Sequence, residues 1–155
     1  MRAPYQILAL PYRVVNGKPM FCVFHRADCD AWQFISGGVE EGEAPYNAAI
    51  REIFEEGGVK VDHVTVLQTR GSLPTSIYPN LASYNWPLDV YVVPEYAFAF
   101  ECKEEITISH EHTEYRWLSY DEAYEILTWD SNRTAMYEVC CRLRHIHGWK
   151  SIFGD

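Results

Sequence analysis

The chain has 155 residues, of which 48% are hydrophobic, and this is enough apolar material for one domain with a core of ordinary size. We therefore predict a single domain over residues 1–155. The formal net charge of -9 at pH 7 argues against a nucleic acid polymer as partner, because proteins that bind one usually present a basic face. No apolar segment near the N-terminus has the length of a secretory or membrane-spanning sequence, so we expect a cytoplasmic protein with no membrane partner.

The predicted elements begin with two strands. Residues 5–15 and 20–26 are apolar and rich in β-branched side chains, and the turn-forming residues 16–19 between them predict a hairpin. A short apolar segment follows and leads into Gly37 and Gly38. Paired glycines indicate a backbone conformation that other residues do not tolerate, and we expect such a conformation at these two positions.

The rest of the chain alternates helices and strands. The predicted helices cover residues 44–56, 120–127 and 131–147, and the predicted strands cover residues 60–70, 88–100 and 115–118. Pro45 and Gly57-Gly58 mark the two ends of the first helix, and Ser119 with Glu122 predicts a capping box for the second. A long loop is expected between residues 70 and 88. This order lacks a regular βαβ repeat, so it favours an α/β fold with a mixed sheet and helices on its faces.

The first predicted helix has two distinct sides. One arc is apolar and is expected to face the core; it comprises Ala49, Ile50, Ile53 and Phe54. The other arc carries Glu52, Glu55 and Glu56, and like charges at this spacing repel one another by a few tenths of a kcal/mol per pair. Clustered carboxylate oxygens are what hard divalent cations prefer, so the spacing indicates a metal site. A solvated acidic surface is the alternative for these three residues taken alone.

The glutamates are part of a longer pattern. Gly37 is followed by five residues, Glu43, seven further residues, and then Arg51-Glu52-Ile53-Phe54-Glu55-Glu56-Gly57-Gly58-Val59. This segment resembles the Nudix box, GX5EX7REUXEEXGU with U an aliphatic residue, at every specified position. The chain is therefore similar to the Nudix hydrolases, and the whole pattern carries the resemblance more strongly than the glutamates do.

The resemblance implies an α/β/α sandwich with a mixed β-sheet, in which the box forms a loop-helix-loop unit that holds Mg²⁺ or Mn²⁺. Glu52, Glu55 and Glu56 would be metal ligands by their motif positions, and Glu55 or Glu56 would be catalytic by activating water. The implied reaction is the attack of that water on a diphosphate bond of a small phosphorylated substrate.

The same resemblance implies structural roles for other residues of the box. Glu43 and Arg51 would hold the loop against the helix, and an ion pair between them is the physical form that we expect. The three glycines, Gly37, Gly38 and Gly58, would allow close approach where side chains would collide.

A further metal ligand from outside the box is implied by the family, and two carboxylates are available. Glu111 is preferred because it falls in a predicted loop, whereas Glu114 begins a predicted strand. His110 and His112 alternate with Glu111, but no further Cys or His follows at a spacing that a zinc site needs.

Beyond the box, the chain resembles the dihydroneopterin triphosphate pyrophosphatase branch, through Trp32-Gln33, the segment around Glu111-His112, and Ser131-Asn132-Arg133. The candidate substrate-binding residues are Arg26 and Arg133 for phosphates, Trp32 for stacking, and Asn132 for a ring edge. Trp86 and Tyr84 are further candidates for stacking, and Asn132 is equally suited to capping the last helix.

Several alternatives remain open at this point. Pro74 follows Val59 by 15 residues, a position associated in this family with ADP-ribose hydrolases, and diadenosine polyphosphates and nucleoside triphosphates such as dNTPs are further candidate substrates. A non-catalytic ligand-binding module is the alternative of another class, but such domains usually lose the glutamates of the box. The sequence leaves the choice between monomer and homodimer open.

Overall fold

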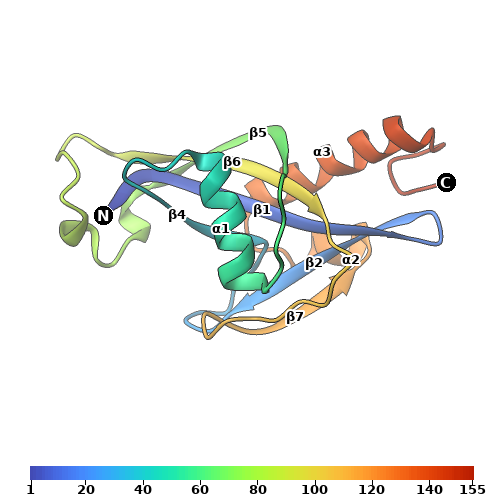
Figure 1. Cartoon of the computed structure of the whole chain (residues 1–155), viewed down its shortest axis with the longest axis horizontal. Coiled ribbons are helices and arrows are strands. Elements are labelled where there is room, and N and C mark those ends of the chain that lie inside the picture. The colour runs from blue at the N-terminus through green and yellow to red at the C-terminus, as the bar shows by residue number, and fades with distance from the viewer.

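The computed structural model describes all 155 residues, and the fold is built on one mixed sheet (Figure 1). The strands are β1 (Arg2–Val15), β2 (Lys18–Arg26), β3 (Trp32–Gln33), β4 (Ile35–Glu40), β5 (Thr65–Pro74), β6 (Val92–Glu101) and β7 (His112–Leu118). The order of the main path is β3-β2-β1-β6-β5, with β4 paired to β1 and β7 paired to β2. β1 and β6 are parallel, and the other pairs are antiparallel.

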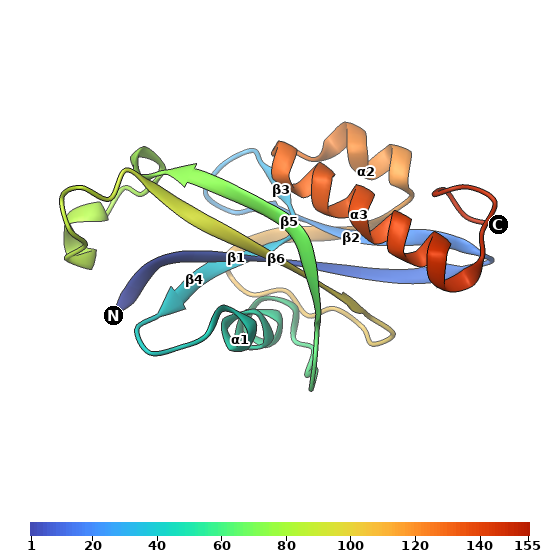
Figure 2. The ribbon, with the colours of Figure 1, turned by 90° about the horizontal axis from the view of Figure 1, so that it is seen from above.

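Helices cover both faces of the sheet. Helix α1 (Pro45–Gly57) lies on one face, and α2 (Tyr120–Ile126) and α3 (Asp130–His147) lie on the other (Figure 2). Each face has its own apolar core, one under α1 around Ile53 and one under α2 and α3 around Met136. The expected α/β/α sandwich with a mixed sheet is therefore confirmed. None of the helices is long and apolar enough to cross a membrane.

β1 organises the sheet because its partners change along its length. Its N-terminal part pairs with β4, its C-terminal part pairs with β2, and β6 runs beside it from Gln6 to Tyr12. As a result β4, which carries Gly37 and Gly38, lies beside the first half of β1, while the end of β2 is free to pair with β7.

The helix ends follow the expected local chemistry. Pro45 occupies the first turn of α1, and Gly58 ends the helix in the left-handed conformation, with φ +68° and its N–H donating to the carbonyl of Phe54. Ser119 and Glu122 form the expected capping box at the start of α2.

The bounds of three expected strands and the orientation of one helix need correction. The strand expected at 60–70 spans Thr65–Pro74, and the one expected at 88–100 begins at Val92. The strand expected at 115–118 already begins at His112, because the register between β2 and β7 extends to Arg26. The prediction of which residues of α1 face the core was also partly wrong. Phe54 is 50% exposed and lies beneath the ammonium group of Lys60, whereas two glutamates of the acidic arc are buried.

The expected long loop between β5 and β6 is present, and it folds back on β1. It contains two short 3₁₀ helices, η1 (Thr75–Ile77) and η2 (Leu81–Tyr84). The Tyr78 hydroxyl donates to Oε1 of Gln6 at 2.7 Å, and Trp86 Nε1 donates to the carbonyl of Arg2 at 2.8 Å. The guanidinium of Arg2 lies 4.8 Å from the centre of the Tyr78 ring. The rings of this loop therefore hold the first strand in place.

Candidate active site

Arg51 joins α1 to the segment that precedes it. Its guanidinium donates to both carboxylate oxygens of Glu43, each at 2.9 Å, and also to the carbonyl of Gly38 at 2.9 Å. The remaining nitrogen reaches Glu52 at 2.8 Å. The expected ion pair between Arg51 and Glu43 is thus present in bidentate form, and the guanidinium beside Glu43 lowers the pKa of that carboxyl.

The two glycines of β4 are needed for space. Neither Gly37 nor Gly38 has a positive φ, so the expectation of an unusual backbone is wrong at both positions. A Cβ at Gly37 would collide with the side chain of Glu52, and a Cβ at Gly38 would collide with that of Arg2. Gly58 combines both requirements, because its φ is positive and a Cβ there would lie 2.8 Å from Cβ of Thr107.

Three carboxyl groups come close together on the side of α1 where Glu52 lies against Gly37. Glu52 and Glu56 lie one turn apart on α1 and are 8% and 4% exposed. The carboxyl of Glu56 is close enough to that of Glu111, an exposed residue in the loop before β7, for a hydrogen bond between them. Burial raises the pKa of Glu52 to about 7. Burial and the bond to Glu111 raise the pKa of Glu56 well above its usual range, whereas the same bond lowers the pKa of Glu111. Neighbouring carboxyl groups disfavour a second negative charge, so this pair favours a bound proton or cation.

Glu55 and Glu114 are placed differently. Glu55 is about half exposed and reaches Arg51 at 3.2 Å, so it lies at the rim of the carboxylate cluster. Glu114 is also about half exposed and accepts from Nε of Arg116 at 2.9 Å. Of the two carboxylates considered outside the box, the structure therefore brings Glu111 to the cluster.

Arg26 and His112 border the cluster on the side of β2 and β7, where they are Cα partners across the two strands. The positive charge of Arg26 acts on the pKa of both Glu56 and Glu111, although its guanidinium is also bonded to Asp28 at 2.6 and 2.7 Å. The His112 ring is buried, with Nε2 3.7 Å from Oε2 of Glu56 and no partner for Nδ1. Sequence reasoning considered His112 only as a zinc ligand and missed this contact.

The donor set of this cluster fits a divalent cation. A cation beside Glu56 and Glu111 would offset the repulsion between their charges, and all the converging donors are the oxygens that Mg²⁺ and Mn²⁺ prefer. No three acidic, His or Cys side chains already surround one point as a complete metal site. Mg²⁺ commonly completes its coordination with waters and phosphate oxygens of the substrate, so an incomplete set of protein ligands suits it.

The other candidate residues have protein partners of their own. The ring of Trp32 lies against His25, at 4.9 Å between centroids, and under the guanidinium of Arg116 at 4.6 Å. Asn132 is 2% exposed, and its Oδ1 accepts from the backbone N–H of Phe34 at 2.8 Å. Asn132 therefore ties α3 to the start of β4, and the idea that it caps α3 is wrong, because the N-cap residue is Trp129.

Arg133 lies apart from the carboxylates. It donates to the carbonyl oxygens of Tyr124 and Leu127 at the end of α2, and it pairs with Asp130 at 2.9 Å. The expectation that Arg133 binds outer phosphates is therefore not supported by its position, because its donors already serve the junction of α2 and α3.

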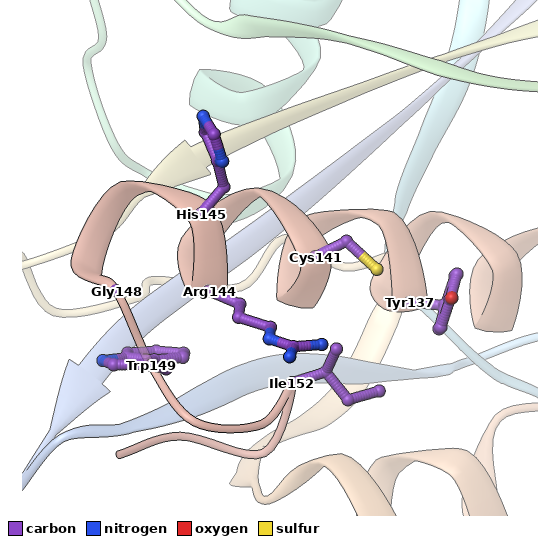
Figure 3. A pocket seen from close by; sticks show the side chains of 7 residues that line it. All are labelled: Tyr137, Cys141, Arg144, His145, Gly148, Trp149 and Ile152. Atoms are coloured by element: carbon purple, nitrogen blue, oxygen red, sulfur yellow. The ribbon is translucent and has the colours of Figure 1, made fainter.

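Hollows on the outer side of α3 do not coincide with the carboxylate cluster. One, of about 410 Å³, lies between α3 and the C-terminal segment and is shown in Figure 3; it is lined by Tyr137, Cys141, Arg144, His145, Gly148, Trp149 and Ile152. Another, of about 450 Å³, contains Arg133. Neither includes a residue of the box.

The geometry agrees with comparisons to known proteins. The family model of the NUDIX domain matches residues 9–140. The RNA pyrophosphohydrolase of Roseobacter denitrificans is 34% identical over 130 residues, which cover 74% of this chain and 81% of that protein.

Two solved structures are also similar. A NUDIX hydrolase from Listeria monocytogenes is 41% identical with a TM-score of 0.80, covering 93% of this chain and 97% of that one. The dihydroneopterin triphosphate pyrophosphohydrolase of E. coli is 27% identical with a TM-score of 0.67, covering 86% of this chain and 92% of that one.

Proposed function

The chain belongs to the Nudix hydrolase family, and we propose that it is a divalent-metal-dependent pyrophosphohydrolase whose substrate is a small nucleoside or pterin triphosphate. Its pyrophosphohydrolase relatives make it a hydrolase of phosphorus-containing anhydrides. The observation that carries the proposal is the convergence of Glu52, Glu56 and Glu111, where burial raises the pKa of both glutamates of α1.

In the proposed reaction, a water oxygen attacks one phosphorus of the diphosphate link. The bond from that phosphorus to the bridging oxygen breaks, and the bridging oxygen leaves with the other phosphate group. We assign Glu56 as the acceptor of the proton from water because it is buried among the converging carboxyls, whereas Glu55 lies at the rim. A cation bound beside Glu56 would favour the ionised carboxylate that this role requires. A bound divalent cation would neutralise charge on the phosphate oxygens and lower the pKa of the water. Arg26 would add a fixed positive charge on the side of β2.

We chose a small triphosphate as the substrate because of the resemblance to the dihydroneopterin triphosphate branch. Trp32-Gln33, Glu111-His112 and Ser131-Asn132-Arg133 resemble the dihydroneopterin triphosphate branch, and the E. coli pyrophosphohydrolase of that name is 27% identical over most of the chain. ADP-ribose and diadenosine polyphosphates remain alternative substrates for the same carboxylates.

An RNA end is a second candidate substrate, and the 34% identity to an RNA pyrophosphohydrolase favours it. It stands against our expectation from the net charge of -9, because a polymer backbone is usually bound by a basic surface. The converging carboxylates would serve a free nucleotide and an RNA end alike, so the distinction requires measurement.

The test is a phosphate and pyrophosphate release assay with Mg²⁺ or with EDTA, on pterin triphosphate, nucleoside triphosphates, ADP-ribose, a diadenosine polyphosphate and a triphosphorylated RNA oligonucleotide. We expect Mg²⁺-dependent release from a free triphosphate and its loss in Glu56→Gln. A strong preference for ADP-ribose, a diadenosine polyphosphate or RNA would overturn the substrate class. Tight binding of these compounds without any turnover would instead favour a ligand-binding module.

A further inference from the structure

A second buried carboxyl group lies on the opposite face of the sheet. Glu95 is in β6, is 5% exposed, and faces the same side as Ala97 and Ala99, which pack in the core under α3. In a strand whose inward positions are otherwise apolar, a glutamate is exceptional. Sequence reasoning did not select it, although this alternation was visible in the residues of β6.

Glu95 has few partners for a buried carboxyl group. The Ser131 hydroxyl at the start of α3 is the one hydrogen-bonding neighbour that lowers its pKa, and burial outweighs it and raises the pKa. No cation acts on it, and the nearby guanidinium of Arg2 is bonded to Gln6 at 2.7 Å. A carboxylate has two oxygens and about four acceptor positions, so most of its capacity to accept hydrogen bonds is unused.

The surroundings of Glu95 are polar and lack a side chain on one side. Its Cα partner on β1 is Gln6, whose side chain bonds Ser36 and Tyr78, each at 2.7 Å. Its neighbour on β5 is Gly71, where a Cβ would come within 3.2 Å of Oε1 of Glu95. The core cluster under α3 ends at Ala97 on this face, and Glu95, Gln6 and Ser36 form a polar layer there. The next inward residue of β6, Val93, is again buried and apolar.

This layer is joined to the proposed active site through the sheet. Gln6 pairs with Glu95 on one side and with Gly38 on the other, so Glu95 is two strands from Gly38, or about 10 Å across the sheet. The carbonyl of Gly38 accepts from Arg51, and the adjacent Gly37 lies against Glu52. The two sites lie on opposite faces of the sheet, so a substrate whose phosphates lie at the carboxylate cluster would have to pass around the edge of the sheet at β4, which pairs with β1, to reach Glu95.

We propose that Glu95 determines substrate specificity by accepting hydrogen bonds from a ring edge that carries adjacent N–H and NH₂ donors, which is the edge shared by guanine and 2-amino-4-oxopteridines. The inference rests on the proposed function, because it concerns the ring of the same triphosphate substrate. A carboxylate matches two parallel donors in bidentate fashion. Adenine offers an acceptor nitrogen at the corresponding ring position, and hypoxanthine has the N–H but lacks the NH₂.

The experiment compares kcat/KM for GTP, ITP and ATP, with Mg²⁺, in the wild-type protein, Glu95→Gln and Glu101→Gln. Glu101 is an exposed glutamate on the same strand, six residues later, and is the matched control. We expect the wild type to prefer GTP over ATP by at least about tenfold, with ITP intermediate, because a bidentate contact to a base contributes about 1–3 kcal/mol of discrimination. Glu95→Gln should lose most of this preference and Glu101→Gln should keep it. The ratio within one preparation does not depend on the fraction of folded protein.

The outcomes separate this inference from the proposed function. An unchanged GTP/ATP ratio in Glu95→Gln, or no preference in the wild type, would overturn the role of Glu95 while leaving the hydrolase intact. If no triphosphate is hydrolysed, the proposed function fails, and calorimetric binding of GMP and AMP to the wild type and to Glu95→Gln still tests the ring site. If Glu95→Gln does not fold by circular dichroism, Glu95→Asp, which withdraws the carboxylate by one methylene, takes its place with the same expectation.

Discussion

Two buried acidic sites lie on opposite faces of the same sheet, and their surroundings differ. On the α1 face, Glu52, Glu56 and Glu111 converge, with Arg51 bonded to one of them and the charge of Arg26 acting on the others. On the α3 face, Glu95 is buried with one hydroxyl partner and no cation. Clustered carboxylates repel each other and require a cation or protons, whereas a single buried carboxylate is satisfied by neutral N–H donors. The comparison teaches that burial alone does not define what an acidic site binds.

The largest effect is expected from Glu56→Gln. Because Glu56 is our assigned proton acceptor, kcat should fall by at least about a thousandfold with the best triphosphate substrate. Without metal, the variant should melt no lower than the wild type, because the neutral amide replaces a carboxyl whose ionised form is disfavoured by burial and by Glu111. Steady-state kinetics and thermal unfolding in EDTA check both statements. A folded variant with near wild-type kcat would contradict the difference in role between the carboxylate cluster and Glu95, because the cluster would then not be catalytic.

The second largest effect is expected from Arg51→Met, which removes the contacts of Arg51 with the segment before α1. It leaves Glu43 and Glu52 without their cationic partner and the Gly38 carbonyl without a donor. Since Arg51 is partly exposed, we expect a loss of about 2 kcal/mol in the free energy of unfolding, below the value for a fully buried pair. Urea unfolding measures it. Arg142→Met, which breaks the i,i+4 pair with Glu138, is the control and should cost less than about 1 kcal/mol.

A smaller effect is expected from His112→Phe. The ring packs on Phe24 at 5.2 Å between centroids, and phenylalanine keeps this ring while removing the nitrogen that lies 3.7 Å from Glu56. Groups that orient metal ligands typically alter metal affinity by about 10- to 100-fold, so the Mg²⁺ concentration for half-maximal activity should rise about tenfold. The Mg²⁺-induced rise in Tm should shrink in parallel, and His110→Phe, at an exposed position, should change neither quantity. If the Mg²⁺ dependence is unaltered, His112 contributes only to packing and does not influence metal binding.

The smallest expected effect is on stability as a function of pH. The pKa of Glu52 is raised to about 7 by burial, so between its usual value and about 7 the folded protein binds more protons than the unfolded chain. Metal-free stability should therefore fall as pH rises through this window. Mg²⁺ should compete with the proton, so its stabilising effect should be small at pH 5 and full at pH 8. Thermal unfolding with Mg²⁺ or EDTA measures this, and equal Mg²⁺ effects at both pH values would contradict it.

The residues of the box were predictable because a helix and a fixed spacing determine which side chains meet. Glu52 and Glu56 had to lie one turn apart, and Arg51 had to face Glu43 if the preceding loop returned to the helix. The sequence pattern of the box did not determine which side of α1 is covered by other segments of the chain. Phe54 is exposed and Glu56 is buried because β4 and the segment of Glu111 pack on the acidic side.

The residues outside the box were harder to assign because their partners are distant in the sequence or belong to the backbone. Arg133 resembled a phosphate ligand, but it is bonded to the carbonyls of Tyr124 and Leu127. Asn132 was considered for a ring edge or a cap, and it bonds the backbone of Phe34. Such contacts depend on how α2 and α3 pack against their neighbours, and the local sequence does not predict this packing.

The change of partners along β1 also has a kinetic consequence. Gln6 pairs with Glu95, and Phe21 on β2 pairs with Leu118, so the central part of the sheet joins segments from opposite ends of the sequence. Closing loops of this length must precede the contacts that stabilise them, and domains dominated by such pairings fold in milliseconds to seconds. Refolding after rapid dilution from urea should therefore be slow for a domain of this size, with the carboxylate cluster assembling only when β6 and β7 have joined the sheet.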